Sequence, residues 1–418
     1  MYSLGIYTIT SYGTWAYAFG VLIESIRADA GWSTSFLGSV YGASMALAGL
    51  SAFWSGRLLD RFGPMVPLGL HAVVASGLLF AAFATSEAWL FAVLFAAGAG
   101  LSGSTGFYAM TTVIATRTRP DRPERAIAVL TLVGAFCSPI YLPVTAWLLT
   151  IWHWRSVGQA LVVAGAAGAV QAMVFTRSHY QKRRRQVQTA TTAPTRDVKA
   201  LGVDPDRHHL PSTRSLDALG RALTNPAVRR ALLVYFLAGA AGSTMWAYQV
   251  PILEATGLSL AAAGTFGGLR GLFQLFGRMG LTTAVERFGS ARLLQAAYLS
   301  TAIGSGALIV GSAGWLRSTW ITPAMLALIF ALTAGSGFGA SSPLQAIHAR
   351  LHFDPGDLGL LMGLQGAVLG LAGGFGPVAG SVMRDISGSW TITISVVLAV
   401  LLLSAYLLSP PRSQAPTG

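Results

Sequence analysis

Twelve apolar runs, each about as long as a membrane span, constrain the fold of this chain more than any other feature. Six runs precede and six follow a polar stretch at 177–226. A helix needs about 20 apolar residues to cross the hydrocarbon core of a bilayer. The runs are continuously apolar, whereas strands of a membrane barrel alternate apolar and polar residues over about ten positions. The pattern predicts an all-α membrane protein with twelve transmembrane helices in two pseudo-symmetric six-helix bundles.

The predicted spans divide the chain into two halves and two polar segments. They cover residues 4–23, 34–54, 66–85, 88–113, 126–149 and 156–176, and then 229–250, 259–281, 291–311, 321–346, 357–382 and 390–409. The predicted domains are an N-terminal bundle (1–176), a basic linker with a disordered centre (177–226), a C-terminal bundle (227–409) and a tail (410–418). Residues 1–23 lack a basic segment and a cleavage site, so the first span is predicted to be retained.

The charge of the chain places it in a membrane rather than on a nucleic acid. Only 10% of its 418 residues are charged, against about a quarter in soluble domains. Of 28 basic residues, 12 lie between Arg177 and Arg230, and most others lie in the loops after spans 2, 4, 8 and 10. Cytoplasmic loops carry such an excess. We therefore expect the linker and both termini in the cytoplasm, and no nucleic-acid partner.

Other features narrow the expected partners. Cys137 is the only cysteine, so neither an internal disulfide nor a cysteine-based metal site is expected, and no cofactor is predicted. The linker run Lys182-Arg183-Arg184-Arg185 is either a solvated anchor or a contact for anionic lipids. Frequent Arg, Ala and Gly suggest the inner membrane of a bacterium, and the chain is expected to act as a monomer.

A glycine-bracketed charged loop follows span 2 and returns in weaker form after span 8. The first copy contains Gly56, Asp60, Arg61 and Gly63, and the second contains Glu286, Arg287, Phe288 and Gly289. With six plus six helices, this loop resembles that of the major facilitator superfamily. The second copy has Thr282 in place of the first glycine. The resemblance implies two repeats with a binding site between them, with Asp60 and Arg61 latching the halves at the cytoplasmic face and Glu286 and Arg287 in the matching gating position.

Within that superfamily, the chain is similar to the monocarboxylate transporter group, which includes oxalate–formate antiporters. The shared features are Gly31-Trp32-Ser33 before span 2, Pro139 and Pro143 in span 5, Trp154-Arg155 at span 6 and Arg270 in span 8. The resemblance implies that Arg270 binds a substrate carboxylate. Phe266 replaces the acid usually found one turn before it, and Gln365 replaces the second cation of span 11. These departures favour a monocarboxylate and leave the coupling ion open.

Arg270 is also singled out by depth alone, since it lies near the centre of span 8. An arginine at mid-bilayer costs about 2.5–3.5 kcal/mol on insertion scales. Its span contains no acid, and a guanidinium binds a carboxylate through two parallel hydrogen bonds. Two interpretations remain: a substrate carboxylate, or backbone carbonyls and an acid on another helix. Gln274, one helical turn on, faces the same side and is a candidate for either binding or packing.

Further candidates lie on other spans. Polar and aromatic residues that could line a binding site are Tyr12, Tyr108, Tyr141, Tyr248, Gln249 and Gln365. For the tyrosines, ordinary packing or an interfacial belt is the alternative. His71 is a candidate proton relay because imidazole titrates near neutrality, with a packed histidine as the alternative.

The sequence therefore predicts a secondary active transporter of small organic anions, most simply monocarboxylates, that works by alternating access. An exporter of drugs or other amphiphiles is the first alternative, although the lone arginine argues against cation export. A membrane receptor or enzyme is the second, and the spans lack the clustered His, Glu or Ser groups that an enzyme would need. No nucleotide-binding Gly-x-x-x-x-Gly-Lys-Ser/Thr loop is present, so ATP is not expected to drive transport.

Overall fold

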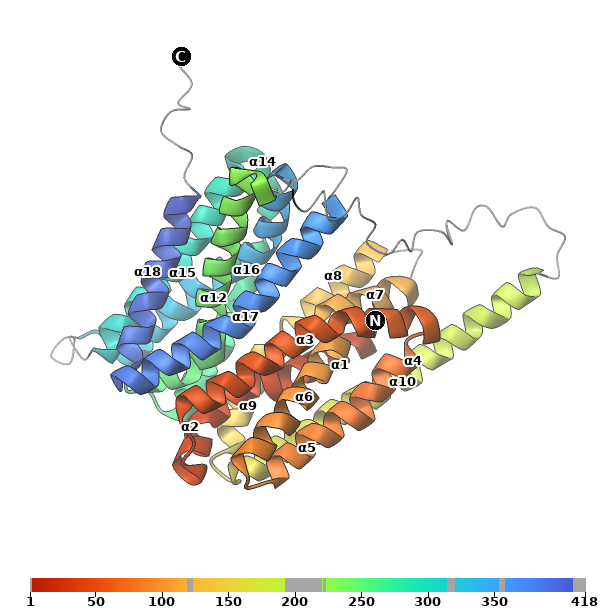
Figure 1. Cartoon of the computed structure of the whole chain (residues 1–418), viewed down its shortest axis with the longest axis horizontal. Coiled ribbons are helices and arrows are strands. Elements are labelled where there is room, and N and C mark those ends of the chain that lie inside the picture. The colour runs from red at the N-terminus through yellow and green to blue at the C-terminus, as the bar shows by residue number, and fades with distance from the viewer. Residues whose placement is uncertain are drawn as a thin grey trace, which may run out of the picture.

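A computed structural model describes most of the chain as helices in two groups that lie side by side (Figure 1). The described residues are 2–118, 123–191, 220, 223–313, 320–352 and 358–408. Within these ranges the structure contains helices and no strands. The predicted fold class is confirmed.

The N-terminal half contains the first six spans, and four of them are built from more than one helical segment. In order, the segments are α1 (Tyr2–Ser11), the π-helical turn η1 (Tyr12–Tyr17), α2 (Ala18–Ala30), α3 (Thr34–Phe62), α4 (Met65–Leu70), the π-helical turn η2 (His71–Ala75), α5 (Ser76–Ala84), α6 (Ala88–Gly106), α7 (Tyr108–Thr118), α8 (Pro123–Gly134), α9 (Cys137–Leu148) and α10 (Trp154–Thr191).

The C-terminal half contains the remaining spans. Its segments are α12 (Pro226–Ala255), α13 (Leu260–Arg278), α14 (Leu281–Phe288), α15 (Ser290–Ser312), α16 (Pro323–His352), α17 (Leu358–Ser387) and α18 (Trp390–Leu407). Ten helices or joined helices of the described residues are long and apolar enough to cross a membrane. The first and eighth predicted spans are not among these ten. Arg270 and Arg278 lower the hydropathy of the eighth.

Helix α10 is longer than the span predicted from the sequence. It continues past residue 176 to Thr191 and so includes the basic run Lys182–Arg185, extending well beyond the bundle in Figure 1. The residues there are mostly Gln, Arg and other helix formers, and the first proline after Pro143 is Pro194. The predicted disordered centre of the linker, residues 192–219, lies outside the described residues.

Two loops repeat between the halves with the same local structure. Gly31 ends α2 at φ 70° and Gly257 follows α12 at φ 98°, and in each case a serine two residues on caps the next helix. Ser33 accepts a hydrogen bond from Phe36 N, and Ser259 accepts one from Ala262 N. A serine at this position satisfies an otherwise unpaired amide at the helix start.

The charged loops repeat as well. Arg61 lies over the ring of Phe62 at 5.2 Å, and Arg287 lies over Phe288 at 5.3 Å. The next residue in each loop, Gly63 or Gly289, has φ of 75° or 78°, a conformation that favours glycine. The weaker sequence copy after span 8 therefore keeps the local structure of the first.

The two halves pack closely along α3 and α17 on the side opposite the linker. A Cβ built on Gly42 would lie 2.5 Å from the carbonyl oxygen of Gly374. At the end of this contact, the Asp385 carboxylate accepts hydrogen bonds from Ser35 N at 2.6 Å and Thr34 N at 3.3 Å. We call the other face, where α3 ends at Phe62 and α13 ends at Arg278, the linker side.

Toward the linker side, α3 and α17 diverge (Figure 1). No atom of the described residues lies within 4 Å of a Cβ built on Gly49, Gly56, Gly366 or Gly370. The same two helices that touch at Gly42 are thus apart further along. The described residues adopt a conformation that is closed on one side and separated on the linker side.

Candidate functional site

Arg270 lies in the middle of α13 and is 2% exposed. Its Nε donates a 2.7 Å hydrogen bond to Oε1 of Gln249 on α12, and its guanidinium carbon lies 5.3 Å from the ring of Phe338. Among the described residues, no acid forms an ion pair with it and no acceptor bonds its two Nη atoms. Gln249 thus holds the Nε of Arg270 in place, while its two Nη atoms have no hydrogen-bond partner among the described residues.

A cavity between the two halves lies on the linker side of Arg270, which is not itself among the lining residues. The cavity has a volume of about 50 Å³, enough for several water molecules or a carboxylate group. The lining residues are Tyr12, Tyr17, Tyr108, Gly134, Ala135, Cys137, Ser138, Gly271, Gln274 and Arg278. The cavity brings together three of the sequence-predicted residues, Tyr12, Tyr108 and Gln274.

The π-helical turn η1 explains why two tyrosines of the first span reach the same cavity. A π-helix bonds residues five apart, so Tyr12 and Tyr17 share a face, with ring centroids 6.5 Å apart. In an ordinary α-helix these positions would diverge by more than a quarter of a turn. Tyr17 was not predicted from the sequence, because an apolar helix carries no signal for such a turn.

Three tyrosines line the cavity, and further aromatic rings pack against them. Phe107, at the break between α6 and α7, stacks on Tyr12 with centroids 3.9 Å apart, and Tyr108 N donates to Tyr12 Oη at 3.4 Å. Trp246 of α12 lies 6.3 Å from Tyr12 and 5.2 Å from Tyr17. The ring faces offer an apolar surface for the body of a ligand.

Two buried polar atoms of this region have no hydrogen-bond partner among the described residues. They are Trp246 Nε1 and Ser138 Oγ. A buried donor without a partner costs about 1–3 kcal/mol. Both atoms can donate a hydrogen bond, and Ser138 lines the cavity, so an acceptor bound there would satisfy its hydroxyl. Neither residue was identified from the sequence, because an uncharged side chain within an apolar span does not stand out from its neighbours.

Arg278 places a positive charge in the wall of the cavity. It is the last residue of α13, and its Nε donates to the carbonyl oxygen of Gly339 at 3.3 Å. Tyr17 lies within electrostatic reach of both Arg270 and Arg278. The sequence analysis counted Arg278 among the loop arginines, whereas the structure places its side chain in the wall of the cavity. The site has an excess of positive charge and hydrogen-bond donors, which suits an anion.

The other predicted binding residues lie away from this cavity. The ring of Tyr141 packs against Gly13 of η1. Tyr248 Oη donates to the Pro377 carbonyl at 2.7 Å and its ring lies 4.9 Å from Trp390. Gln365 is buried on α17, and its Oε1 has no partner among the described residues.

His71, the candidate proton relay, is buried within η2. Its Nδ1 lies 2.9 Å from Tyr7 Oη and 3.2 Å from Thr105 Oγ1, and its Nε2 lies 3.5 Å from Ser102 Oγ. Ser102 in turn accepts a hydrogen bond from Trp15 Nε1 at 3.2 Å, and the Trp15 ring stacks on Phe107. A polar network therefore links His71 to the aromatic wall of the cavity.

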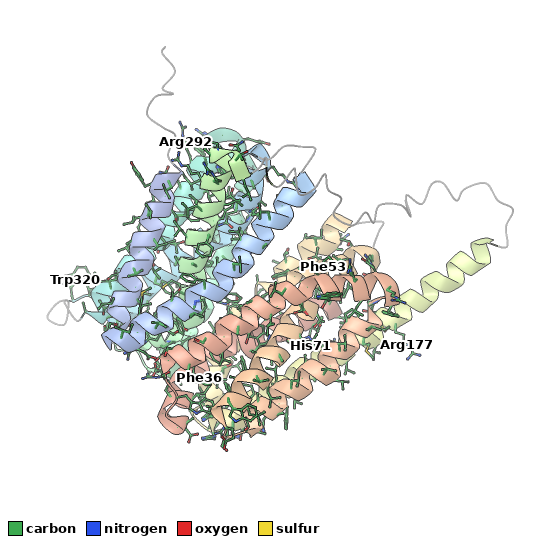
Figure 2. The ribbon with its side chains drawn as sticks, viewed as in Figure 1. Phe36, Phe53, His71, Arg177, Arg292 and Trp320 are labelled. Atoms are coloured by element: carbon green, nitrogen blue, oxygen red, sulfur yellow. The ribbon has the colours of Figure 1, made fainter. Side chains whose placement is uncertain are left out.

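The charged residues at the end of α3 make their contacts within the N-terminal half. Asp60 is paired with Arg117 of α7. Together with Gly56 they line a cavity of about 270 Å³ on the linker side. Figure 2 labels Phe53 on α3, whose ring lies 4.3 Å below the Arg57 guanidinium. In this conformation the ion pair between Asp60 and Arg117 joins α3 to α7.

Comparison of this chain with known proteins gives three findings. The family model of the Major Facilitator Superfamily matches residues 4–352. No curated protein sequence matches the chain. Solved structures match it over nearly the full length, although their sequence identity is low.

Three of these structures are transporters with the same fold. A D-xylose-proton symporter matches with a TM-score of 0.70 and 16% identity over 99% of this chain and 97% of that one. The nucleoside transporter NupG matches with a TM-score of 0.70 and 11% identity over 97% and 95%. The xylose transporter XylE from E. coli, in an inward open conformation, matches with a TM-score of 0.67 and 14% identity over 99% and 96%. The fold and the family match over most of the chain together identify it as a multi-pass membrane transporter that belongs to the Major Facilitator Superfamily.

Proposed function

We propose that this chain is a secondary active transporter of small monocarboxylates and that Arg270 binds the substrate carboxylate. The observation that carries the proposal is the state of Arg270: a buried guanidinium in mid-helix, with Nε held by Gln249 and no acid paired with it among the described residues. A buried charge is stable only when it is paired or hydrogen-bonded. A substrate carboxylate supplies both the charge and the two acceptors that the Nη atoms lack.

The surroundings of Arg270 support a small anion with an apolar body. The cavity on its linker side is lined by Tyr12 and Tyr17, and Phe107 stacks on Tyr12. These rings favour contact with carbon atoms over contact with water. The lack of a second cation in span 11, where Gln365 stands, favours one carboxylate over two by charge matching. The same wall suits an apolar amphiphile, so export of neutral amphiphiles is the second candidate function.

The conformation suggests how the substrate would move. The halves are closed at Gly42 and Gly374 and apart on the linker side. In the proposed cycle, rocking of the halves exposes Arg270 to each side in turn. If the linker side is cytoplasmic, as the arginine distribution predicts, the described conformation is the inward-facing one. Asp60, Arg61, Glu286 and Arg287 would then meet across the halves when that side closes.

Uptake into proteoliposomes distinguishes the two candidate functions. We expect the purified protein to accumulate labelled benzoate or lactate and to ignore benzyl alcohol, which keeps the ring of benzoate without its charge. The guanidinium recognises the carboxylate and a neutral alcohol cannot replace it. Equal inhibition of uptake by benzoate and benzyl alcohol would favour the amphiphile exporter instead, and empty liposomes control for passive diffusion of the acids.

The role proposed for His71 is testable in the same assay. His71 bonds Tyr7 and Thr105 and has an imidazole that can exchange a proton. We expect His71→Gln to keep exchange of labelled for unlabelled substrate and to lose accumulation driven by an imposed pH gradient, because glutamine keeps a hydrogen bond but carries no proton. Gradient-driven accumulation at the wild-type level in this variant would assign His71 to packing alone.

A further inference from the structure

Arg278 repeats the arrangement of Arg270 two helical turns further along α13. Each arginine has its Nε bound to an uncharged oxygen, Gln249 Oε1 in one case and the Gly339 carbonyl in the other. Neither forms an ion pair with an acid of the described residues. Gln274 lies midway between them, so the three side chains form a ladder at positions i, i+4 and i+8 on one helix face.

The cavity lies along Gln274 and Arg278 of this ladder, and its composition favours anions. Arg278 and Gln274 line it from the C-terminal half, and Tyr12, Tyr17, Tyr108 and the unpartnered Ser138 hydroxyl line it from the N-terminal half. No Asp or Glu is among its lining residues. The wall therefore supplies one guanidinium, one amide and several hydroxyl donors, with no negative charge to compete with a bound anion.

Geometry decides whether the two arginines act on one anion or on two positions. Eight residues of α-helix separate their Cα atoms by about 12 Å. Both side chains leave the helix tilted toward its N-terminus, so the tilt does not bring the two groups together. Arg278 lines the cavity, whereas Arg270 is buried and is not among its lining residues. The arginines therefore mark two separate positions along one path.

We propose that Gln274 and Arg278 form a second carboxylate-binding position at the linker-side mouth of the cavity, separate from Arg270. The inference rests on the proposed function, since it assigns to the same substrate a holding position between the linker side and Arg270. Arg278 is exposed, so an anion from the aqueous phase reaches it first. The carboxylate then passes along Gln274 and the tyrosine hydroxyls to the buried Arg270 fork.

The only cysteine of the chain provides a reporter, because Cys137 lines the same cavity. The experiment compares how fast purified full-length protein reacts with a negatively charged and a positively charged methanethiosulfonate reagent of similar size. We expect the negative reagent to react faster in the wild type. Arg278→Gln should lower the ratio of the two rates about tenfold, since a unit charge in the wall of the same cavity is only partly screened there. Arg278→Lys should keep most of the ratio.

Protection by benzoate separates this proposal from the one for Arg270. Benzoate should slow Cys137 modification in the wild type and in Arg270→Gln, and should fail to do so in Arg278→Gln. Arg292→Gln, an exposed arginine at the edge of the molecule (Figure 2), should behave as the wild type. An unchanged rate ratio and intact protection in Arg278→Gln would overturn the second position and leave Arg270 unaffected. Should Cys137 react too slowly, Ala135→Cys with Cys137→Ala places the thiol in the same wall.

Discussion

Arg270→Ala is expected to abolish carboxylate uptake while leaving the protein folded. Two hydrogen bonds from the Nη atoms to a carboxylate are charge-assisted and worth about 1.5–3 kcal/mol each. Their loss should lower uptake at a fixed substrate concentration by roughly a hundredfold or more, at 1.4 kcal/mol per factor of ten. Uptake of labelled benzoate into proteoliposomes measures the loss, and Arg292→Ala is the matched control because Arg292 lies outside the cavity.

Thermal stability separates a binding role for Arg270 from a structural one. An uncompensated arginine at mid-membrane destabilises the helix that carries it by about 2.5–3.5 kcal/mol on insertion scales. Removing it should therefore leave the melting temperature in detergent unchanged or raise it. A structural arginine, held by carbonyls or an acid, would give the opposite result: a lower melting temperature together with lost uptake.

Arg270→Lys sharpens the same test. Lysine keeps the charge, but its compact ammonium lacks the fork and has no Nε to bond Gln249. We expect binding weaker by about tenfold or more, with benzoate inhibition still measurable at high concentration. Wild-type uptake by the lysine variant would show that charge alone suffices and would exclude the two-point geometry proposed for the carboxylate.

The sequence predicts the fold of this chain well because the membrane imposes a long and uniform signal. Every span must be apolar over about 20 residues, so the helices and the repeat of the Arg61 and Arg287 loops follow from hydropathy and spacing. Arg270 is found for the same reason, as a charge at a depth where charges are rare. Gln249, which bonds Arg270, was predicted as a separate candidate on span 7. Only the packing of α12 against α13 brings Gln249 and Arg270 together.

The remaining site residues depend on features that hydropathy does not record. Tyr17 reaches the cavity because η1 has a π-helical turn, and Trp246 lies against Tyr17 through the contact between the halves. Arg278 lies at a helix end, where a basic residue normally contacts water, so its sequence position predicts a loop role. Its place in the cavity wall follows from the packing of α13 against α9. These positions are set by tertiary packing rather than by local sequence.

Gly42→Ala is expected to open the side of the protein that is closed in the described conformation. The added Cβ would lie 2.5 Å from Gly374 O and 2.6 Å from a methyl carbon of Val378. Backbone atoms cannot move away without separating α3 from α17. Overpacking of this kind costs ~1–3 kcal/mol, which would shift the balance between the two conformations by about five- to 150-fold. Uptake should fall, because one of the two states becomes hard to reach.

A cysteine on the facing helix reports the shift, and a glycine on the same helix controls for it. Ser381 is fully buried on α17 and faces Gly38, so Ser381→Cys with Cys137→Ala should react with a maleimide only when that side opens. Gly42→Ala should raise its reaction rate, whereas Gly49→Ala should not, since a Cβ on Gly49 meets no described atom within 4 Å. Both substitutions raise helix propensity by the same amount, so the difference between them isolates the contact at Gly42. Equal reaction rates in the two variants would mean that α3 and α17 do not separate at Gly42 during transport. The contact at Gly42 would then stay closed throughout the transport cycle.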